Sequence, residues 1–86
     1  MLRLAGEVDA ETVAAYQRDH PSVGQMVAAV DMSEVSFLSS SAVSFVIRQT
    51  QPVRDHGQLP ALRGVSAPAR RVLELIGVIG LFAVAV

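Results

Sequence analysis

The first residues alternate between apolar and polar positions, as expected for a strand with one buried face. Leu2, Leu4 and Val8 carry the apolar side of this pattern, which predicts a strand that ends near Gly6. Met26 to Met32 is instead a short, nearly continuous apolar run between turn signals. Such a run predicts a second strand, covered on one face by helices.

Two further strands are predicted in the second half of the chain. Gln58 to Val65 forms one, although Pro60 within it indicates an edge position, a bulge or a later start. Leu81 to Val86 forms the last, in a tail that is apolar from Leu75 onward. This tail is too short to cross a bilayer, which takes about 20 apolar residues, so we expect it to be buried in the domain.

A helix is predicted between the first two strands. Asp9 has the position of an N-cap, and the helix runs to about Asp19 because a proline follows two residues later. Val13 and Tyr16 would supply its buried side. The segment from Pro21 to Gln25 is then a loop.

The longest helical pattern runs from about Ser40 to Asp55. Phe45 lies off its apolar stripe and suggests a contact surface, and Pro52 should bend or end the helix because it lacks a backbone donor. Gly57 is suited to cap its end. The stripe itself consists of Val43, Val46, Ile47 and Val53, with Thr50 between them.

A third helix is predicted to begin at Ser66 or Ala67, with Pro68 in its first turn, and to stop at Gly77. Its apolar stripe is predicted to comprise Val72, Leu75 and Ile76, while Arg70, Arg71 and Glu74 face water.

Strands and helices therefore alternate from one end of the chain to the other. Such an order implies parallel strands joined by right-handed crossovers. We expect an α/β fold in a single domain, residues 1–86, with a mostly parallel four-stranded sheet and helices packed on it.

Composition narrows the range of functions. A net charge of −1 and an aromatic content of 5% favour neither a basic surface nor a stacking platform for nucleic acid. The absence of cysteine excludes disulfides and thiolate metal sites. No basic segment precedes an apolar stretch at the start, so we expect a cytoplasmic protein without insertion into a membrane.

Candidate chemistry is concentrated in one stretch, Ser39 to Ser41, at the start of the second helix. Backbone N–H groups and the helix dipole favour a negative charge such as a phosphate there, although serines in this place can also simply cap the helix. His20 and His56 stand alone in predicted loops, and no catalytic motif is found. We therefore expect no enzyme activity, no metal and no cofactor.

Three segments resemble the successive signatures of STAS domains, most closely those of bacterial anti-anti-sigma factors, also called anti-sigma factor antagonists. They are GEVDAET (6–12), VDMSEVSFLSSSAV (30–43) and LRGVSAPARRVLELIGV (62–78), and together they cover nearly the whole chain in the family's order. The resemblance implies the STAS fold, a β–α superhelix. It also implies that the chain lacks the usual first strand, which the family has ahead of Met1.

The resemblance further implies regulation of transcription by partner switching. Such a protein binds an anti-sigma factor that is also a GHKL-type serine kinase, and so frees a sigma factor. Phosphorylation breaks the complex, and a PP2C-type phosphatase restores it. Similarity places the phosphoacceptor at Ser40, with Ser39 and Ser41 as second choices. The implied partner-binding residues are Ser39, Ser41, Ser44, Phe45 and Arg48.

Two positions depart from the family's pattern. Ser39 stands where the family usually has Asp, and Ala42 stands where it usually has Gly, so that the Ala42 methyl could crowd an approaching kinase. A second interpretation keeps the fold and makes the chain a STAS subunit of an ABC-type lipid transport system that docks on a cytoplasmic ATPase. Without the first strand, the exposed sheet edge could also pair with another copy to form a homodimer.

Overall fold

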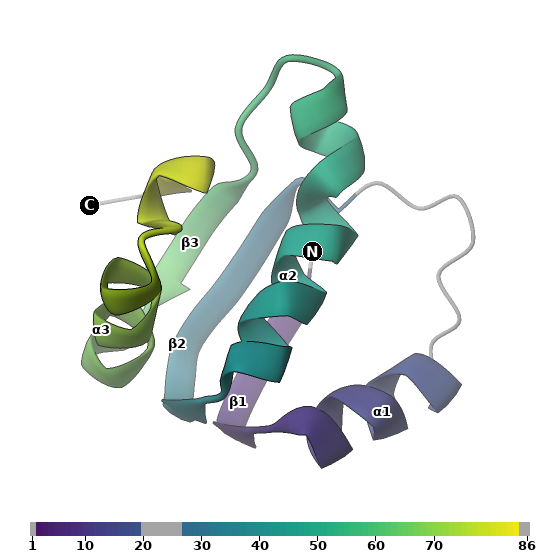
Figure 1. Cartoon of the computed structure of the whole chain (residues 1–86), viewed down its shortest axis with the longest axis vertical. Coiled ribbons are helices and arrows are strands. Elements are labelled where there is room, and N and C mark those ends of the chain that lie inside the picture. Colours follow the sequence, from purple (N-terminus) through teal and green to yellow (C-terminus); the bar gives the residue numbers. More distant parts are fainter. Residues whose placement is uncertain (1, 20–26, 85–86) are drawn as a thin grey trace.

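The fold is described by a computed structural model of residues 2–19 and 27–84, in which strands and helices alternate (Figure 1). The elements are β1 (Leu2–Val8), α1 (Ala10–Asp19), β2 (Ala29–Leu38), α2 (Ser40–Asp55), β3 (Ala61–Val65), α3 (Ala67–Ile76), the 3₁₀ turn η1 (Ile79–Leu81) and β4 (Ala83–Val84). The predicted loop at 21–25 and the start of the second predicted strand at Met26 lie outside the described residues.

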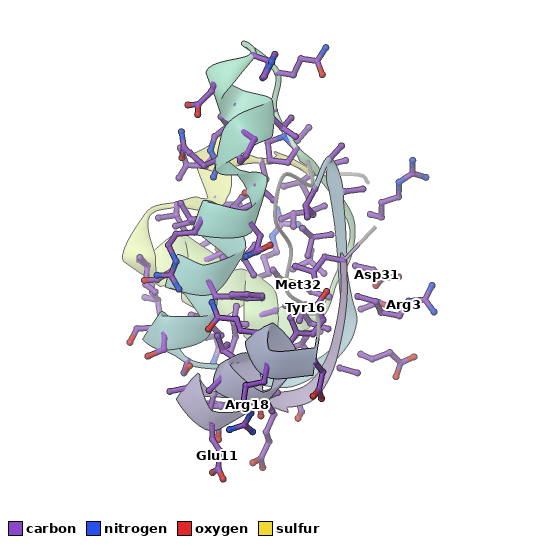
Figure 2. The ribbon with its side chains drawn as sticks, turned by 90° about the vertical axis from the view of Figure 1, so that its right-hand side faces the viewer. Arg3, Glu11, Tyr16, Arg18, Asp31 and Met32 are labelled. Atoms are coloured by element: carbon purple, nitrogen blue, oxygen red, sulfur yellow. The ribbon has the colours of Figure 1, made fainter. Side chains whose placement is uncertain are left out.

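The four strands form one sheet in the order β1-β2-β3-β4, and every pair of neighbours is parallel. Because each connection moves one strand along in the same direction, right-handed crossovers place the helices on one face. Figure 2 shows this arrangement edge-on, with Arg3 and Asp31 pointing away from the helices. The predicted α/β fold with a parallel four-stranded sheet is confirmed.

The strand β2 is longer than the apolar pattern indicated. It continues past Met32 to Leu38, and its pairing with β1 shifts register twice along the way. The buried residues Val35 and Leu38 are therefore three positions apart, a spacing that conceals the strand because regular strands bury every second residue. The strand β1 also extends beyond Gly6, to Val8.

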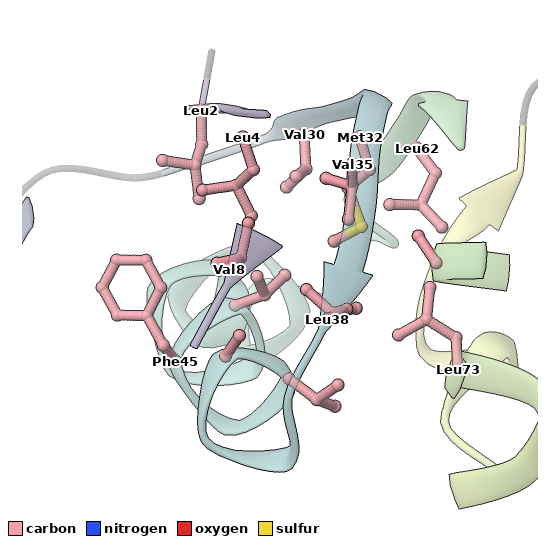
Figure 3. Close-up of a cluster of buried hydrophobic side chains, with 14 of the residues drawn as sticks. Leu2, Leu4, Val8, Val30, Met32, Val35, Leu38, Phe45, Leu62 and Leu73 are labelled. Carbon is pink, nitrogen blue, oxygen red and sulfur yellow. The ribbon is translucent and has the colours of Figure 1, made fainter. Parts of the chain in front are cut away.

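One hydrophobic core fills the space between the sheet and the helices (Figure 3). Phe45, Leu62 and Leu73 are each at most 1% exposed, and burying a side chain of this size contributes about 1.5–3 kcal/mol. The other members with side chains in this cluster are Leu2, Leu4, Val8, Val13, Val30, Met32, Val35, Leu38, Ala42, Val43, Val46, Ala69 and Phe82.

Pro52 lies inside α2 and does not end the helix, which continues to Asp55. Side chains brace the turn before the proline. The Thr50 hydroxyl donates to the Val46 carbonyl at 2.8 Å, and the Arg54 guanidinium donates to the Ile47 carbonyl. These bonds reinforce the turn just before Arg48, whose carbonyl is the one that loses its N–H donor to the proline.

The helix α3 turns a different side to the sheet than its apolar pattern predicted. Ala69 and Leu73 are fully buried, whereas Leu75 is 80% and Ile76 47% exposed, so placing these two on the buried stripe was wrong. Only Val72 of the predicted stripe packs partly against the core. The predicted start and stop are confirmed, since the Ser66 side chain caps the first turn and a left-handed Gly77 ends the helix.

The last two strands begin later than predicted. Strand β3 begins only at Ala61, which is the late start that Pro60 allowed, and the Pro60 carbonyl instead accepts from the Ala83 N–H at 2.9 Å. Between α3 and β4 the chain forms η1 where an extended segment had been expected from Leu81. The predicted final residues, 85–86, lie outside the described range.

Candidate functional site

The N termini of α1, α2 and α3 gather at one edge of the sheet, where the parallel strands end (Figure 1). A single residue separates each strand from the helix that follows, and these residues, Asp9, Ser39 and Ser66, cap the helices. Ser66 also donates its hydroxyl to the Val35 carbonyl, which ties α3 to β2. In open α/β sheets, ligands usually bind outside the carboxyl ends of the strands.

Ser39 is committed to the structure of this edge. Its Oγ accepts the Ala42 N–H at 3.1 Å, which caps α2, and its own N–H donates to the Val8 carbonyl at 2.9 Å. The residue is half-buried. Ser39 therefore holds the start of α2 against the end of β1, and its hydroxyl is less available than those that follow.

Ser40 and Ser41 occupy the first turn of α2, and both are exposed. Ser44 and Arg48 are exposed as well, and the four-residue spacing of Ser40, Ser44 and Arg48 places them on one side of the helix. We call Ser40, Ser41, Ser44 and Arg48 the serine face. The first turn of α2 contains no acidic residue, so the positive end of the helix dipole is not neutralised from within the helix.

Phe45 does not belong to this surface, and its prediction as a partner-binding residue is wrong. The side chain is 1% exposed, and its ring meets the Tyr16 ring edge-on, with centroids 5.5 Å apart and planes at 72°. The Tyr16 ring belongs to α1, which packs beside α2. It covers a side of α2 that the apolar pattern of α2 alone predicted to be exposed. Phe45 is therefore a core residue that joins two helices.

Phe37 is an exposed aromatic residue that the sequence pattern did not single out. It is 51% exposed near the end of β2, two residues before the cap of α2, while its neighbour Leu38 is buried. The sequence pattern missed Phe37 because the apolar residues at the end of β2 are spaced irregularly and do not alternate as in a regular strand. Large exposed aromatic side chains are common anchors of protein interfaces.

The other polar side chains that could have formed a site either make structural contacts or face solvent. Arg70 forms an exposed ion pair with Glu74 at 2.7 Å, and Arg71 lines a shallow hollow with Ala67 and Pro68. His56 is exposed, with Nδ1 2.7 Å from the Pro52 carbonyl, and His20 lies outside the described residues.

Within residues 2–19 and 27–84, no three His, Cys, Asp or Glu side chains come close enough together to hold a metal ion. None of the helices in this part of the chain has the length and apolar character needed to span a membrane. What the edge offers chemically is a pair of exposed hydroxyl groups at the positive end of a sixteen-residue helix. Such groups suit phosphate transfer from a partner or direct docking.

Comparison with protein-family models finds none that matches the chain, and comparison with curated proteins finds no match either.

Proposed function

We propose that this chain is an anti-sigma factor antagonist with a STAS fold. Its serine face would bind an anti-sigma factor of the GHKL-type serine-kinase class, and phosphorylation of Ser40 would release that partner. A PP2C-type phosphatase would return the chain to its binding state. The proposal joins the resemblance of three sequence segments to an all-parallel sheet built from alternating strands and helices.

The observation that carries the proposal is that the hydroxyl groups of Ser39 and Ser40 have different environments. The Ser39 hydroxyl caps α2, whereas Ser40 is exposed one residue later in the first turn. A kinase can therefore reach Ser40 without disturbing the cap. This geometry favours Ser40 over Ser39 as the acceptor and leaves Ser41, which is also exposed, as the second choice.

A phosphate at Ser40 would act through its charge. It would add roughly two negative charges at a helix N terminus, where backbone N–H groups and the dipole stabilise them, so the fold should persist. A partner that docks on the serine face would then have to desolvate those charges. The switch would therefore oppose binding electrostatically and need no change of fold.

The two departures from the family's pattern affect this surface differently. Ala42 is fully buried, so its methyl group faces the core and does not crowd a kinase at the surface. Ser39 retains the capping role that an Asp would have, without its charge. Kinase recognition would then depend on the exposed serine face.

Phosphorylation is tested by incubating the chain with ATP and a purified GHKL-type anti-sigma kinase from the same genome, followed by mapping of the modified residue. We expect phosphate on Ser40 and its loss in Ser40→Ala. Ser41→Ala is the matched control and should still be modified. Incorporation that continues unchanged in Ser40→Ala would exclude this acceptor.

Binding is tested by titrating the same kinase with the unmodified chain. Arg48→Glu reverses a charge on the serine face and should weaken the complex, whereas Arg63→Glu on the open face of the sheet should not. Equal effects of the two substitutions would exclude the serine face as the contact. Binding to the cytoplasmic ATPase of an ABC-type transporter, with none to an anti-sigma factor, would favour the alternative role as a transporter subunit.

A further inference from the structure

One face of the sheet is not covered by helices in the described part of the chain (Figure 2). Sheets made only of parallel strands usually have both faces covered, so this open face is unusual. Near the carboxyl ends of β1 and β2, Glu7 lies opposite Phe37 and both are exposed. The pair that follows, Val8 and Leu38, is buried under the helices, and Glu34 is exposed one residue before another buried position of β2. Glu7, Glu34 and Phe37 therefore share the open face, and we call them the open-face site.

The charges on the open face are divided between its two ends. Arg3 lies opposite Asp31 toward the amino ends of the strands, with 3.8 Å between Nε and Oδ2, and Arg63 precedes the residue of β3 that pairs with Asp31. Glu7 and Glu34 lie toward the carboxyl ends, and neither carboxylate has an ion-pair partner among the described residues. The end of the open face that carries an exposed aromatic ring is therefore acidic, with no cation of its own in this part of the structure.

We propose that the open-face site binds an arginine-bearing segment of a partner protein. The Phe37 side chain is 51% exposed, and Glu7 is its direct neighbour on a strand about 4.7–4.9 Å away. A guanidinium group can stack on the face of an aromatic ring while its N–H groups donate to a carboxylate beside the ring. Glu34, on the same face, offers a carboxylate to a second arginine of the segment. The unpaired carboxylates and the ring thus complement a flat cationic group in both charge and shape.

Backbone contacts hold the open-face site in place. The Thr12 hydroxyl donates to the Glu7 carbonyl at 3.3 Å, so α1 fixes the backbone of Glu7 while its side chain stays exposed. The Ser39 N–H donates to the Val8 carbonyl, which ties the ends of β1 and β2 together. The serine face lies on α2, on the other side of the sheet. Binding at the open-face site is therefore independent of phosphorylation at Ser40, and its test does not rely on the proposed function.

A proton–nitrogen NMR titration of the whole chain tests this site. The probe is a capped glycine peptide with two arginines, added to about 10 mM, and the matched probe has lysine in place of both arginines. We expect the arginine peptide to shift the amide signals of Glu7, Glu34 and Phe37. The lysine peptide should bind more weakly, because an ammonium group lacks the planar fork that stacks on a ring and pairs with a carboxylate. The absence of shifts at this site, or equal binding of the two peptides, overturns the proposal.

Substitutions separate a specific site from general attraction to a negative charge. Phe37→Ala and Glu7→Gln should each weaken binding of the arginine peptide about two- to fivefold. Glu74→Gln removes the same charge from α3, where the carboxylate pairs with Arg70, and should leave binding unchanged. Equal weakening by Glu7→Gln and Glu74→Gln would mean nonspecific attraction and overturns the proposal.

Sedimentation equilibrium of the chain without peptide tests the other possible occupant. We expect a monomer whose behaviour does not change in Phe37→Ala. A dimer that Phe37→Ala dissociates would show that a second copy of the chain covers the open-face site, which also overturns the proposal. The dispersion of each variant's NMR spectrum verifies that it is folded.

Discussion

Three adjacent serines at the start of α2 have different roles because a helix N terminus treats successive positions differently. The residue before the helix can cap it only through a side chain that turns back to the backbone, and Ser39 does so. The next two residues are helical and exposed. The hydroxyl of Ser39 is therefore structural, whereas the hydroxyls of the next two residues, Ser40 and Ser41, are accessible.

Replacing Ser39 with Ala should destabilise the fold by about 1 kcal/mol, because the Ala42 N–H loses its cap. For a chain of this size that corresponds to a melting temperature about 4–8 °C lower. Ser41→Ala, which removes an exposed hydroxyl of the same helix turn, should change the free energy of unfolding by less than about 0.5 kcal/mol. Thermal melts of the two variants would contradict the assigned roles if they were shifted equally.

Asp9 should make stability depend on pH. The Thr12 N–H, which donates to Asp9 Oδ1 at 2.9 Å, is the main cause that lowers the pKa of this carboxyl. Since the pKa is lower in the folded than in the unfolded chain, the stabilisation is complete above the ordinary value, about 3.9, and is lost as the pH falls through the folded value. Asp9→Asn can still cap α1 but carries no charge.

Melting temperatures of the unmodified chain and Asp9→Asn should therefore converge as the pH falls from about 5 to about 2. A difference between the two that stays constant over this range would show that the Asp9 charge does not stabilise the fold.

At the scale of elements, α3 shows that several residues can supply an apolar stripe and that packing selects among them. Ala69 and Leu73 face the sheet, while Val72 is only half-buried and Leu75 points outward. Alanine is a weak marker of a buried face, so the larger residues Leu75 and Ile76 dominated the pattern. The position of β2 beneath α3 decides which side is buried, and this contact is not local in the sequence.

Replacing leucine with alanine at two positions of α3 tests which side of this helix is buried. Leu73→Ala should destabilise the fold by about 2–5 kcal/mol, because it opens a cavity in the core. Leu75→Ala should change the free energy of unfolding by less than about 0.5 kcal/mol, since its side chain is 80% exposed. Chemical denaturation gives both values, and a larger loss at Leu75 would mean that another molecule or segment covers it.

At the scale of the whole molecule, the fold brings three helix N termini to one edge of a parallel sheet. The serine face extends from this edge along α2, on the side turned away from the core. The rest of α2 is anchored by α1 through Phe45 and by the C-terminal segment through Arg54, whose guanidinium donates to the Leu81 carbonyl at 3.2 Å and lies over the Phe82 ring. A charge added at Ser40 would therefore lie on a helix that these contacts hold in place.

Ser40→Asp tests whether a charge at this position spares the fold. A carboxylate in the first turn interacts favourably with the helix dipole, so the free energy of unfolding should stay the same or rise by about 0.3–1 kcal/mol. Thermal melting measures this, and a proton–nitrogen NMR spectrum should retain its dispersion. A marked loss of stability or dispersion would mean that phosphorylation acts by changing the conformation.

The sequence by itself determined the order of strands and helices, their parallel arrangement, and the caps at Asp9, Ser39, Ser66 and Gly77. These features follow from local periodicity, from side chains that bond to nearby backbone groups, and from the handedness of crossovers. It also located the serines at the head of α2. The periodicity and the caps depend on residues that are close in the sequence, and the parallel arrangement follows from the general handedness of strand–helix–strand units.

Only the tertiary structure decided which apolar residues are buried and how far β2 extends. Phe45 is buried because α1 lies beside α2, and Leu75 is exposed because β2 meets another side of α3. The two register shifts that carry β2 on to Leu38 come from its pairing with β1. Each outcome depends on contacts between elements distant in the sequence, whose relative positions no local pattern specifies.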